Sequence, residues 1–199
     1  MTRDAGRVAE PKLVEVKDRA AWRRWLQKHH ASSPSVWLAV RKKGAAKPGV
    51  SYEEAVEEAL CFGWVDGTLN RLDGDYYKLW FAPRKRKSVW AANNKRRVEE
   101  LIRMGRMTEA GLAVIEAAKR DGFWDSLEPV DSLAVPDDLA KALKANPAAK
   151  RNFEAFPPSS RKLVLFWIQS AKRPQTRAKR IAEAVRRAAE NVRANHWRQ

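Results

Sequence analysis

The sequence predicts an α+β fold with a small antiparallel β-sheet and surrounding helices, followed by an all-helical C-terminal module. The clearest sheet signal is a pair of stretches rich in β-branched and aromatic residues on either side of the turn at Asp73–Asp75. Apolar residues with helical spacing flank this hairpin, and after residue 135 only helical patterns occur. We therefore expect a flexible N-terminus at residues 1–12, an α+β domain at 13–130 and a helical module at 135–195.

The first elements are a short strand, a helix and a second strand. Residues 13–16 have the apolar side chains of an edge strand. Asp18 is a favoured helix N-cap, and the apolar residues after it recur with helical spacing. Residues 36–43 have the composition of a strand and run into a turn-rich segment. The apolar positions of the first helix are Trp22, Trp25, Leu26 and His29.

The second helix has a defined beginning and end. Ser51 and Glu54 form a capping box, in which each side chain accepts a hydrogen bond from the other residue's backbone amide. The helix runs into the stretch ALCFGWVDG, where Gly63 and Gly67 permit backbone that other residues resist. This stretch predicts a tight corner between the helix and the hairpin.

Two further helices are expected after the hairpin. Ser88 is the predicted N-cap of a helix that ends at Gly105, in the position of a left-handed C-cap. Thr108 begins the next helix, with Leu112, Ile115 and Ala118 inside, which stops near Gly122. The segment 125–136 contains two prolines and several acidic residues, and it is the best candidate for a linker.

The C-terminal module is predicted to contain four helices. Two short helices fall within 136–156, and Ser159 or Ser160 caps a strongly apolar third helix. Pro174 ends that helix, and residues 176–192 form the last one.

The chain is strongly basic, with 40 Lys and Arg against 24 Asp and Glu, which gives a net charge of +16. Such a charge attracts polyanions, either nucleic acid or an anionic lipid surface, although an ordinary solvated basic surface gives the same composition. From residue 135 onward there are 15 basic and 5 acidic residues. A row of arginines on the last helix is the candidate polyanion-binding face. Its members are Arg173, Arg177, Arg180 and Arg187.

The polar and aromatic residues of the corner and hairpin form the candidate site for a small polar ligand. The chain supplies a carboxylate, a guanidinium, a hydroxyl and amides beside indole rings, which suits such a ligand. The alternative is structural: Ser88 caps a helix, Asp66 pairs with Arg84, and the tryptophans fill the core. The candidate residues are Trp64, Asp66, Arg84, Ser88, Trp90, Asn93 and Asn94.

The usual catalytic and metal-binding patterns are not found. Cys61 is the single cysteine, so no internal disulfide forms, and its apolar helix end favours a buried, inert thiol. His29 and His30 are adjacent and point in different directions on a helix, while His196 lies near the end of the chain. We expect no metal, no catalytic residues and, without a P-loop or a dinucleotide fingerprint, no cofactor. Without a signal peptide or a membrane span, we expect a cytoplasmic protein.

Several blocks of the chain resemble a known family. They are WRRWLQKHH, VWLAVRKKG, SYEEAVEEALCFGWVDG, FAPRKRKSVWAANN, LIRMGRMTEAGLAVIEAAKRDGFWD, PDDLAKALKANPAAKRNFE and AKRPQTRAKRI. Together, over roughly residues 13 to 195, they resemble the bacterial YdeI/OmpD-associated family, also labelled bacteriocin-protection proteins. The resemblance implies a link to survival of bacteriocins or antimicrobial peptides, and it brings no catalytic residues, cofactor or substrate.

Three functions follow as hypotheses. The first is a non-catalytic binding protein in stress or antimicrobial resistance. The second is a sequence-independent nucleic-acid-binding protein that uses the basic C-terminal helices. The third is an enzyme acting on a small polar substrate near Trp64 and Asp66. Because a protein of charge +16 repels cationic peptides, direct sequestration of such a peptide is disfavoured. The sequence does not predict the oligomeric state.

Overall fold

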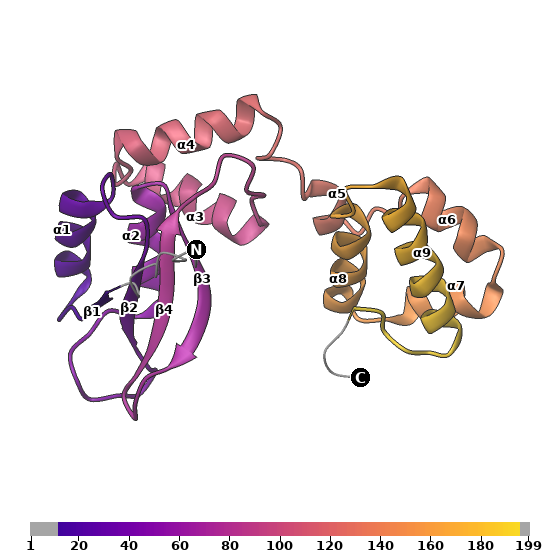
Figure 1. Ribbon diagram of the computed structural model, residues 1–199, viewed down its shortest axis with the longest axis horizontal. Coiled ribbons are helices and arrows are strands. Elements are labelled where there is room, and N and C mark those ends of the chain that lie inside the picture. The colour runs from indigo at the N-terminus through magenta and orange to yellow at the C-terminus, as the bar shows by residue number, and fades with distance from the viewer. Residues whose placement is uncertain (1–11, 196–199) are drawn as a thin grey trace, which may run out of the picture. The chain divides into compact units, whose positions relative to one another are not determined.

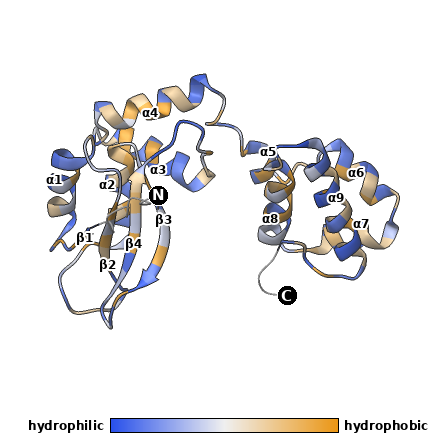
Figure 2. Cartoon of the chain, in the orientation of Figure 1, coloured by the Kyte–Doolittle hydropathy of each residue, from blue (hydrophilic) through white to orange (hydrophobic). Residues whose placement is uncertain are grey.

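The computed structural model describes residues 12–195, and the chain divides into two compact units between Trp124 and Asp125 (Figure 1). The predicted flexible N-terminus lies outside the described residues except for Lys12. Helices and a mixed sheet make up the first unit, and the described part of the second unit is helical, which confirms the α+β prediction. Hydrophilic residues recur along the helices of both units (Figure 2).

The first unit has a four-stranded sheet in the order β1-β2-β4-β3. β4 pairs antiparallel with both β2 and β3, as the hairpin signal predicts, whereas β1 pairs parallel with β2. The sheet is therefore mixed instead of wholly antiparallel, because α1 connects β1 to β2 and a helical crossover returns the chain in the same direction. The elements are β1 (Leu13–Val14), α1 (Arg19–His29), β2 (Val36–Arg41), α2 (Tyr52–Cys61), β3 (Trp64–Arg71), β4 (Tyr76–Pro83), α3 (Ala92–Arg103) and α4 (Glu109–Arg120).

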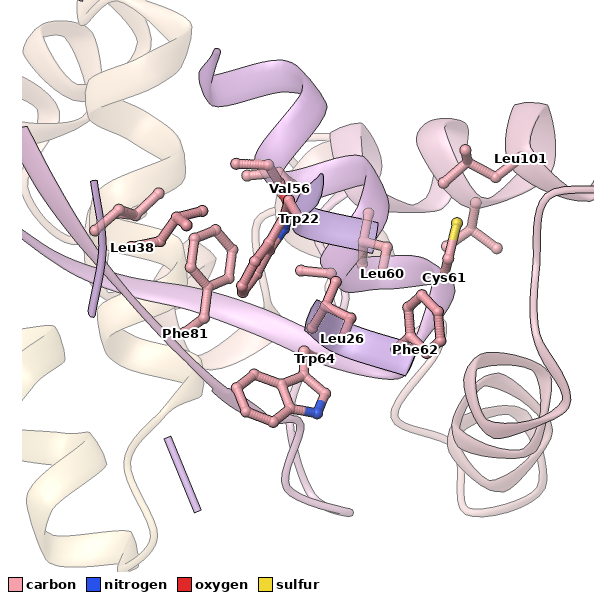
Figure 3. Packing of buried hydrophobic residues seen from close by; sticks show 14 of the residues in the cluster. Trp22, Leu26, Leu38, Val56, Leu60, Cys61, Phe62, Trp64, Phe81 and Leu101 are labelled. Atoms are coloured by element: carbon pink, nitrogen blue, oxygen red, sulfur yellow. The ribbon is translucent and has the colours of Figure 1, made fainter. Parts of the chain in front are cut away.

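The core of the first unit lies where α1 and α2 pack on the sheet. Alternate residues of β2 and β4 face these helices, and Leu38 and Phe81 are fully buried there. Trp22 of α1 packs against Phe81 at 5.5 Å between ring centroids (Figure 3). Its indole N–H donates to the backbone oxygen of Ala55 on α2 at 3.1 Å, so the buried polar atom of this ring is satisfied.

Local signals set several boundaries. Asp18 and Thr108 cap α1 and α4 through their side chains, and Gly105 adopts positive φ after α3, as predicted. α4 stops near Gly122 as predicted, and Gly122 also has positive φ. The capping box of α2 is also confirmed.

Removal of this capping box gives the first prediction. Replacement of Ser51 by alanine is expected to reduce the free energy of unfolding of the first unit by about 1 kcal/mol, because the Glu54 amide loses its acceptor. Urea unfolding followed by circular dichroism measures the change. Ser32→Ala, at an exposed turn, is the matched control. Equal stability of the two variants would contradict the role of the cap.

Two predicted helix starts are wrong. Ser88 does not cap α3, which begins after Ala91 without a side-chain cap, because the Ser88 amide closes a turn onto the Lys85 oxygen at 2.9 Å. Neither Ser159 nor Ser160 caps α8, because Pro158 already occupies the first turn, where its fixed φ suits a helix.

Within α4, Ile115 and Ala118 are buried as predicted, but Leu112 is 36% exposed. Helical spacing places an apolar residue near the buried face, but it does not say how far that face extends.

In the second unit the helices pack around a separate apolar cluster. The predicted linker, 125–136, belongs to this unit, because it contains a short helix and contributes Val130 to the cluster. Pro174 does interrupt the chain after α8, but it is also the first residue of the last helix, two residues earlier than predicted. The elements are α5 (Glu128–Asp131), α6 (Asp137–Lys144), α7 (Pro147–Ala155), α8 (Pro158–Gln169) and α9 (Pro174–Ala189).

Candidate functional site

The predicted corner at Gly63 brings three elements of the first unit together. Gly63 has φ +73°, and a Cβ at this position would lie 2.8 Å from Cγ2 of Val114 on α4. The backbone oxygen of Gly63 accepts a hydrogen bond at 2.9 Å from the amide of Arg84, the residue after β4. A residue without a Cβ is therefore needed where α4, the start of β3 and the end of β4 meet.

Arg84 carries a buried positive charge. Its residue surface is 9% exposed, and its guanidinium lies 3.9 Å from the ring centroid of Trp90. Nη1 donates to the Val89 oxygen at 3.0 Å. Burial lowers the pKa of Arg84 to about 10, and the negative charge of Asp66 offsets this only in part. The group is therefore still a cation at neutral pH.

Two donors at this place have no acceptor. Within residues 12–195, neither Nε of Arg84 nor the indole Nε1 of Trp90 has a hydrogen-bond partner, although both atoms are buried. A buried donor left unpaired costs about 1–3 kcal/mol, so such atoms call for an explanation. Trp90 is 2% exposed and packs against Trp124 at 4.9 Å between ring centroids.

Both side chains line a cavity of about 280 Å³ in the first unit. α4 supplies one side of it with small apolar side chains, and the chain after Arg84 supplies two more cations. Arg86 of this pair forms an ion pair with Asp121 at 2.6 Å. The lining residues are Arg84, Lys85, Arg86, Trp90, Ala113, Val114, Ala117 and Ala118.

Asp66 forms no ion pair with Arg84 in the described chain, since Arg84 donates to the Val89 oxygen and the Asp66 carboxylate accepts a hydrogen bond from the Tyr52 hydroxyl at 3.0 Å. Burial, together with the charge of Asp66 and this hydrogen bond, raises the pKa of Tyr52 to about 12. The phenol is thus a protonated donor at neutral pH. Tyr52 was not a predicted site residue, because nothing in its local sequence separates it from any first residue of a helix.

The other predicted residues lie outside the cavity lining. Trp64 is buried, and its indole N–H donates to the His30 oxygen at 3.1 Å, so it serves the core. Asn93 and Asn94 accept from Arg96 and Arg97 at 3.2 and 3.1 Å on the surface of α3. Of the seven predicted residues, Arg84 and Trp90 line the cavity. Lys85, Arg86 and the small residues of α4 are additions from the structure, although the basic run after Arg84 was visible in the sequence.

Two family models match the chain, one in each of its two compact units. A family model described as a domain of unknown function, DUF8412, matches residues 14–114. The chain belongs to this family. A second model, described as Bacteriocin-protection, YdeI or OmpD-Associated (OmdA), matches residues 132–191 and confirms the predicted family resemblance there. The N-terminal blocks of that resemblance fall in the DUF8412 range. No curated protein and no solved structure matches the chain.

In the OmdA-matched unit, most of the predicted arginine row is engaged by neighbouring groups. Arg177 binds Asp138 through two hydrogen bonds of 2.6 and 2.9 Å, and Arg187 pairs with Glu183 at 2.6 Å. Arg180 donates to the Trp167 oxygen and stacks on the Trp167 ring at 5.3 Å. Arg173, just before α9, is exposed.

In the DUF8412 unit Cys61 is buried, and burial together with the charge of Glu58 raises the pKa of its thiol. A neutral, buried thiol is a poor nucleophile. Among residues 12–195, no group of three or more His, Cys, Asp or Glu is placed to hold a metal ion. His196 lies outside the described residues. The described helices also include none long and apolar enough to cross a bilayer.

Proposed function

We propose that the DUF8412 unit is a non-catalytic binding module for a small organic anion, which Arg84 and Trp90 hold. The observation that carries this proposal is that two residues with a buried, unpartnered N–H group, Arg84 and Trp90, line the same cavity. Both N–H groups are covered by their surroundings, so a carboxylate or phosphate oxygen would accept from them after the Arg84 and Trp90 side chains shift toward the cavity. The same oxygen would compensate the charge of Arg84.

The lining suggests what kind of anion would fit. A volume of about 280 Å³ is at the small end for a ligand pocket, so the ligand is small. The alanines of α4 and the Trp90 ring favour an apolar portion beside the charged group. Lys85 and Arg86 add positive charge at the same cavity, which favours an anion over a neutral or cationic ligand.

The chemistry of the two donors favours binding over catalysis. Arg84 stays protonated until its pKa of about 10, and an indole N–H does not titrate in the physiological range. Neither group takes up or releases a proton at neutral pH, so their role is to orient and hold a ligand.

For the cell, we propose that this binding contributes to stress or antimicrobial resistance of the kind that the OmdA match suggests. A chain of charge +16 is unsuited to capturing a cationic peptide directly. Protection would therefore act through an anionic ligand. Polyanion binding by the C-terminal arginines has less support, because Arg177, Arg180 and Arg187 already contact groups of their own unit.

The two N–H groups can be followed directly by NMR, which gives the second prediction. Sodium benzoate and inorganic phosphate are titrated to about 10 mM, enough to reveal a Kd of about 1 mM. We expect benzoate to shift the Arg84 Nε–H and Trp90 Nε1–H signals together. The indole signals of Trp22 and Trp64 are internal references, because both N–H groups already have backbone acceptors.

Two variants complete this test. Arg84→Gln is expected to abolish the Trp90 shift, whereas Arg71→Gln, the same charge change at an exposed position of β3, should leave it unchanged. Shifts of equal size in both variants would show non-specific attraction. No shift with either anion would overturn the proposed site.

A further inference from the structure

We propose a second anion site in the first unit, between α1, α2 and α3, which takes an amphipathic organic anion: a phosphate or carboxylate that carries a short alkyl chain. A cavity of about 320 Å³ lies there, separate in its lining from the cavity at Arg84. Arg19, Arg96, Arg97 and Arg106 contribute guanidinium groups to it, and Leu101 and Met104 contribute apolar surface.

Positive charge exceeds negative charge around this cavity. Its two acidic residues are already engaged, since Glu57 pairs with Arg19 at 2.8 Å and Glu100 pairs with Arg103. Arg96 and Arg97 instead donate to the neutral side-chain amides of Asn93 and Asn94. In the part of the chain that the structure describes, neither of these two guanidiniums forms an ion pair with a carboxylate. Arg97 also lies over the Tyr52 ring at 5.9 Å. What distinguishes the two guanidiniums is that no carboxylate of the described chain neutralises their charge, which an incoming anion would do.

A buried carboxylate outside the cavity lining holds two of the cavity's arginines. Glu58 is fully buried and accepts from Arg19 at 2.6 Å, from Arg23 at 2.7 Å and from Arg106. Arg23 also donates to the backbone oxygen of Arg106 at 2.9 Å. These bonds hold Arg19 and Arg106 in place before any ligand arrives, which reduces the entropy lost on binding.

Arg106 is only partly occupied by its contacts within the chain. Its Nε is buried and lacks a hydrogen-bond partner within residues 12–195, although its Nη2 binds Glu58. Because this Nε is covered, an anion in the cavity would meet the exposed part of the Arg106 guanidinium, whose side chain is 36% exposed.

The apolar residues indicate that the anion has a hydrocarbon portion. Leu101 is 2% exposed and belongs to the core of the first unit, whereas Met104, just after α3, is 59% exposed. Methionine adapts its shape to a partner, so Met104 can cover an alkyl chain whose charged end meets the arginines.

The test compares three probes: n-hexyl phosphate, inorganic phosphate and n-hexanol. Calorimetric titrations use the full chain carrying Arg84→Gln, so that heat from the first cavity does not contribute. We expect n-hexyl phosphate to bind about tenfold more tightly than inorganic phosphate, and n-hexanol not to bind. Comparable affinity for n-hexyl and inorganic phosphate would overturn the amphipathic assignment, and absence of n-hexyl phosphate binding would overturn the site.

Charge-matched variants locate the binding. Arg96→Gln with Arg97→Gln is expected to weaken n-hexyl phosphate binding by about tenfold or more. Arg24→Gln with Lys28→Gln removes the same charge at exposed positions of α1 and is expected to leave the affinity within about twofold. Equal losses in the two pairs would overturn the proposal.

A last arm separates a free ligand from a lipid headgroup. Vesicles of phosphatidylcholine and phosphatidylglycerol are tested for co-sedimentation with the same variants. We expect the cavity pair and the control pair to bind these vesicles alike, because the proposal is for a monomeric anion. Vesicle binding that depends on Arg96 and Arg97, without n-hexyl phosphate binding, would replace the proposed ligand by a membrane surface.

Discussion

Replacement of Glu58 by glutamine is expected to destabilise the first unit by about 3 kcal/mol, because it removes the negative charge that three arginines surround. The carboxylate is fully buried, whereas the Arg19, Arg23 and Arg106 side chains are between 26 and 36% exposed. Water therefore recovers part of the lost interaction for the arginines, which places the expected loss at the lower end for a broken buried ion pair.

Urea unfolding at pH 7, followed by tryptophan fluorescence, measures this loss. Glu116→Gln is the matched control, since Glu116 is exposed on α4, and its replacement should change the free energy of unfolding by less than about 0.5 kcal/mol. A Glu58→Gln variant as stable as this control would show that the arginines are held by other contacts.

The effect of Glu58 should depend on pH in a defined direction. Burial opposes ionisation, but hydrogen bonds from Arg19 and Arg23 and the charges of Arg19 and Arg106 outweigh it, so the pKa of Glu58 lies below its usual range. A depressed pKa in the folded state stabilises the protein above the unfolded pKa, about 4.3 for glutamate. That stability is lost as the pH falls through the folded value. The difference between the wild type and Glu58→Gln should therefore be largest at pH 6 to 7 and shrink below about pH 4. A difference that grows with acidity would contradict the assignment.

Glu58 also shows why sequence reasoning found one part of the molecule and missed another. Four glutamates occur in the α2 sequence, and an acid-rich helix normally exposes its acidic side chains. The pattern that points to a buried acidic partner is on α1, where Arg19 and Arg23 are four residues apart on the side that also buries Trp22 and Leu26. Their distance of nearly 40 residues from Glu58 makes the cluster a tertiary property.

The elements that could be predicted are those set by neighbouring residues. Asp18, the Ser51 capping box and the turn at Asp73 each act within three residues of their partners, and the structure contains all three. The parallel pairing of β1 was missed, because it depends on where α1 returns the chain. The helical character of 128–131 was missed because burial of Val130 in the second core stabilises it.

In the candidate site, too, features set by neighbouring residues could be predicted and features set by distant residues could not. Arg84 and Trp90 were predicted from an unusual mixture of residue types in one stretch. Their cavity depends on Ala113 and Ala117 of α4, more than 20 residues later, whose small size reads locally as ordinary helix composition. Their unpaired N–H groups could not be inferred from sequence, because the sequence equally allows Asp66 to pair with Arg84.

Replacement of Gly111 by alanine is the other change from which we expect a large loss of stability, and it affects the wall of the same cavity. A Cβ at Gly111 would lie 2.3 Å from the backbone oxygen of Cys61 and 2.8 Å from its carbonyl carbon. Thr108 holds the same oxygen through its amide at 3.1 Å and its hydroxyl at 2.6 Å, so the start of α4 is tied to the end of α2. Two backbone segments, and not a mobile side chain, would have to separate.

Helix propensity alone predicts that Gly111→Ala raises the free energy of unfolding, whereas we expect it to fall. Alanine is favoured over glycine inside a helix by about 1 kcal/mol, whereas overpacking of a close contact costs about 1–3 kcal/mol and more when backbone must move. We expect a net loss of about 3 kcal/mol in urea unfolding, because the contact involves two main chains. Gly74→Ala, in a turn with no atom within 4 Å of the added Cβ, should stay within about 0.5 kcal/mol of the wild type.

Ligand binding should report the same displacement. If α4 moves away from Cys61, its residues Ala113 and Ala117 move relative to Arg84, and the cavity that they share changes shape. Folded Gly111→Ala protein should therefore show smaller benzoate-induced shifts at Trp90 Nε1–H, while Gly74→Ala keeps the full shift. A Gly111→Ala variant with wild-type stability and unchanged shifts would mean that α4 tolerates the added methyl group without moving. In that case the close packing of α4 on α2 would not determine the shape of the Arg84 cavity.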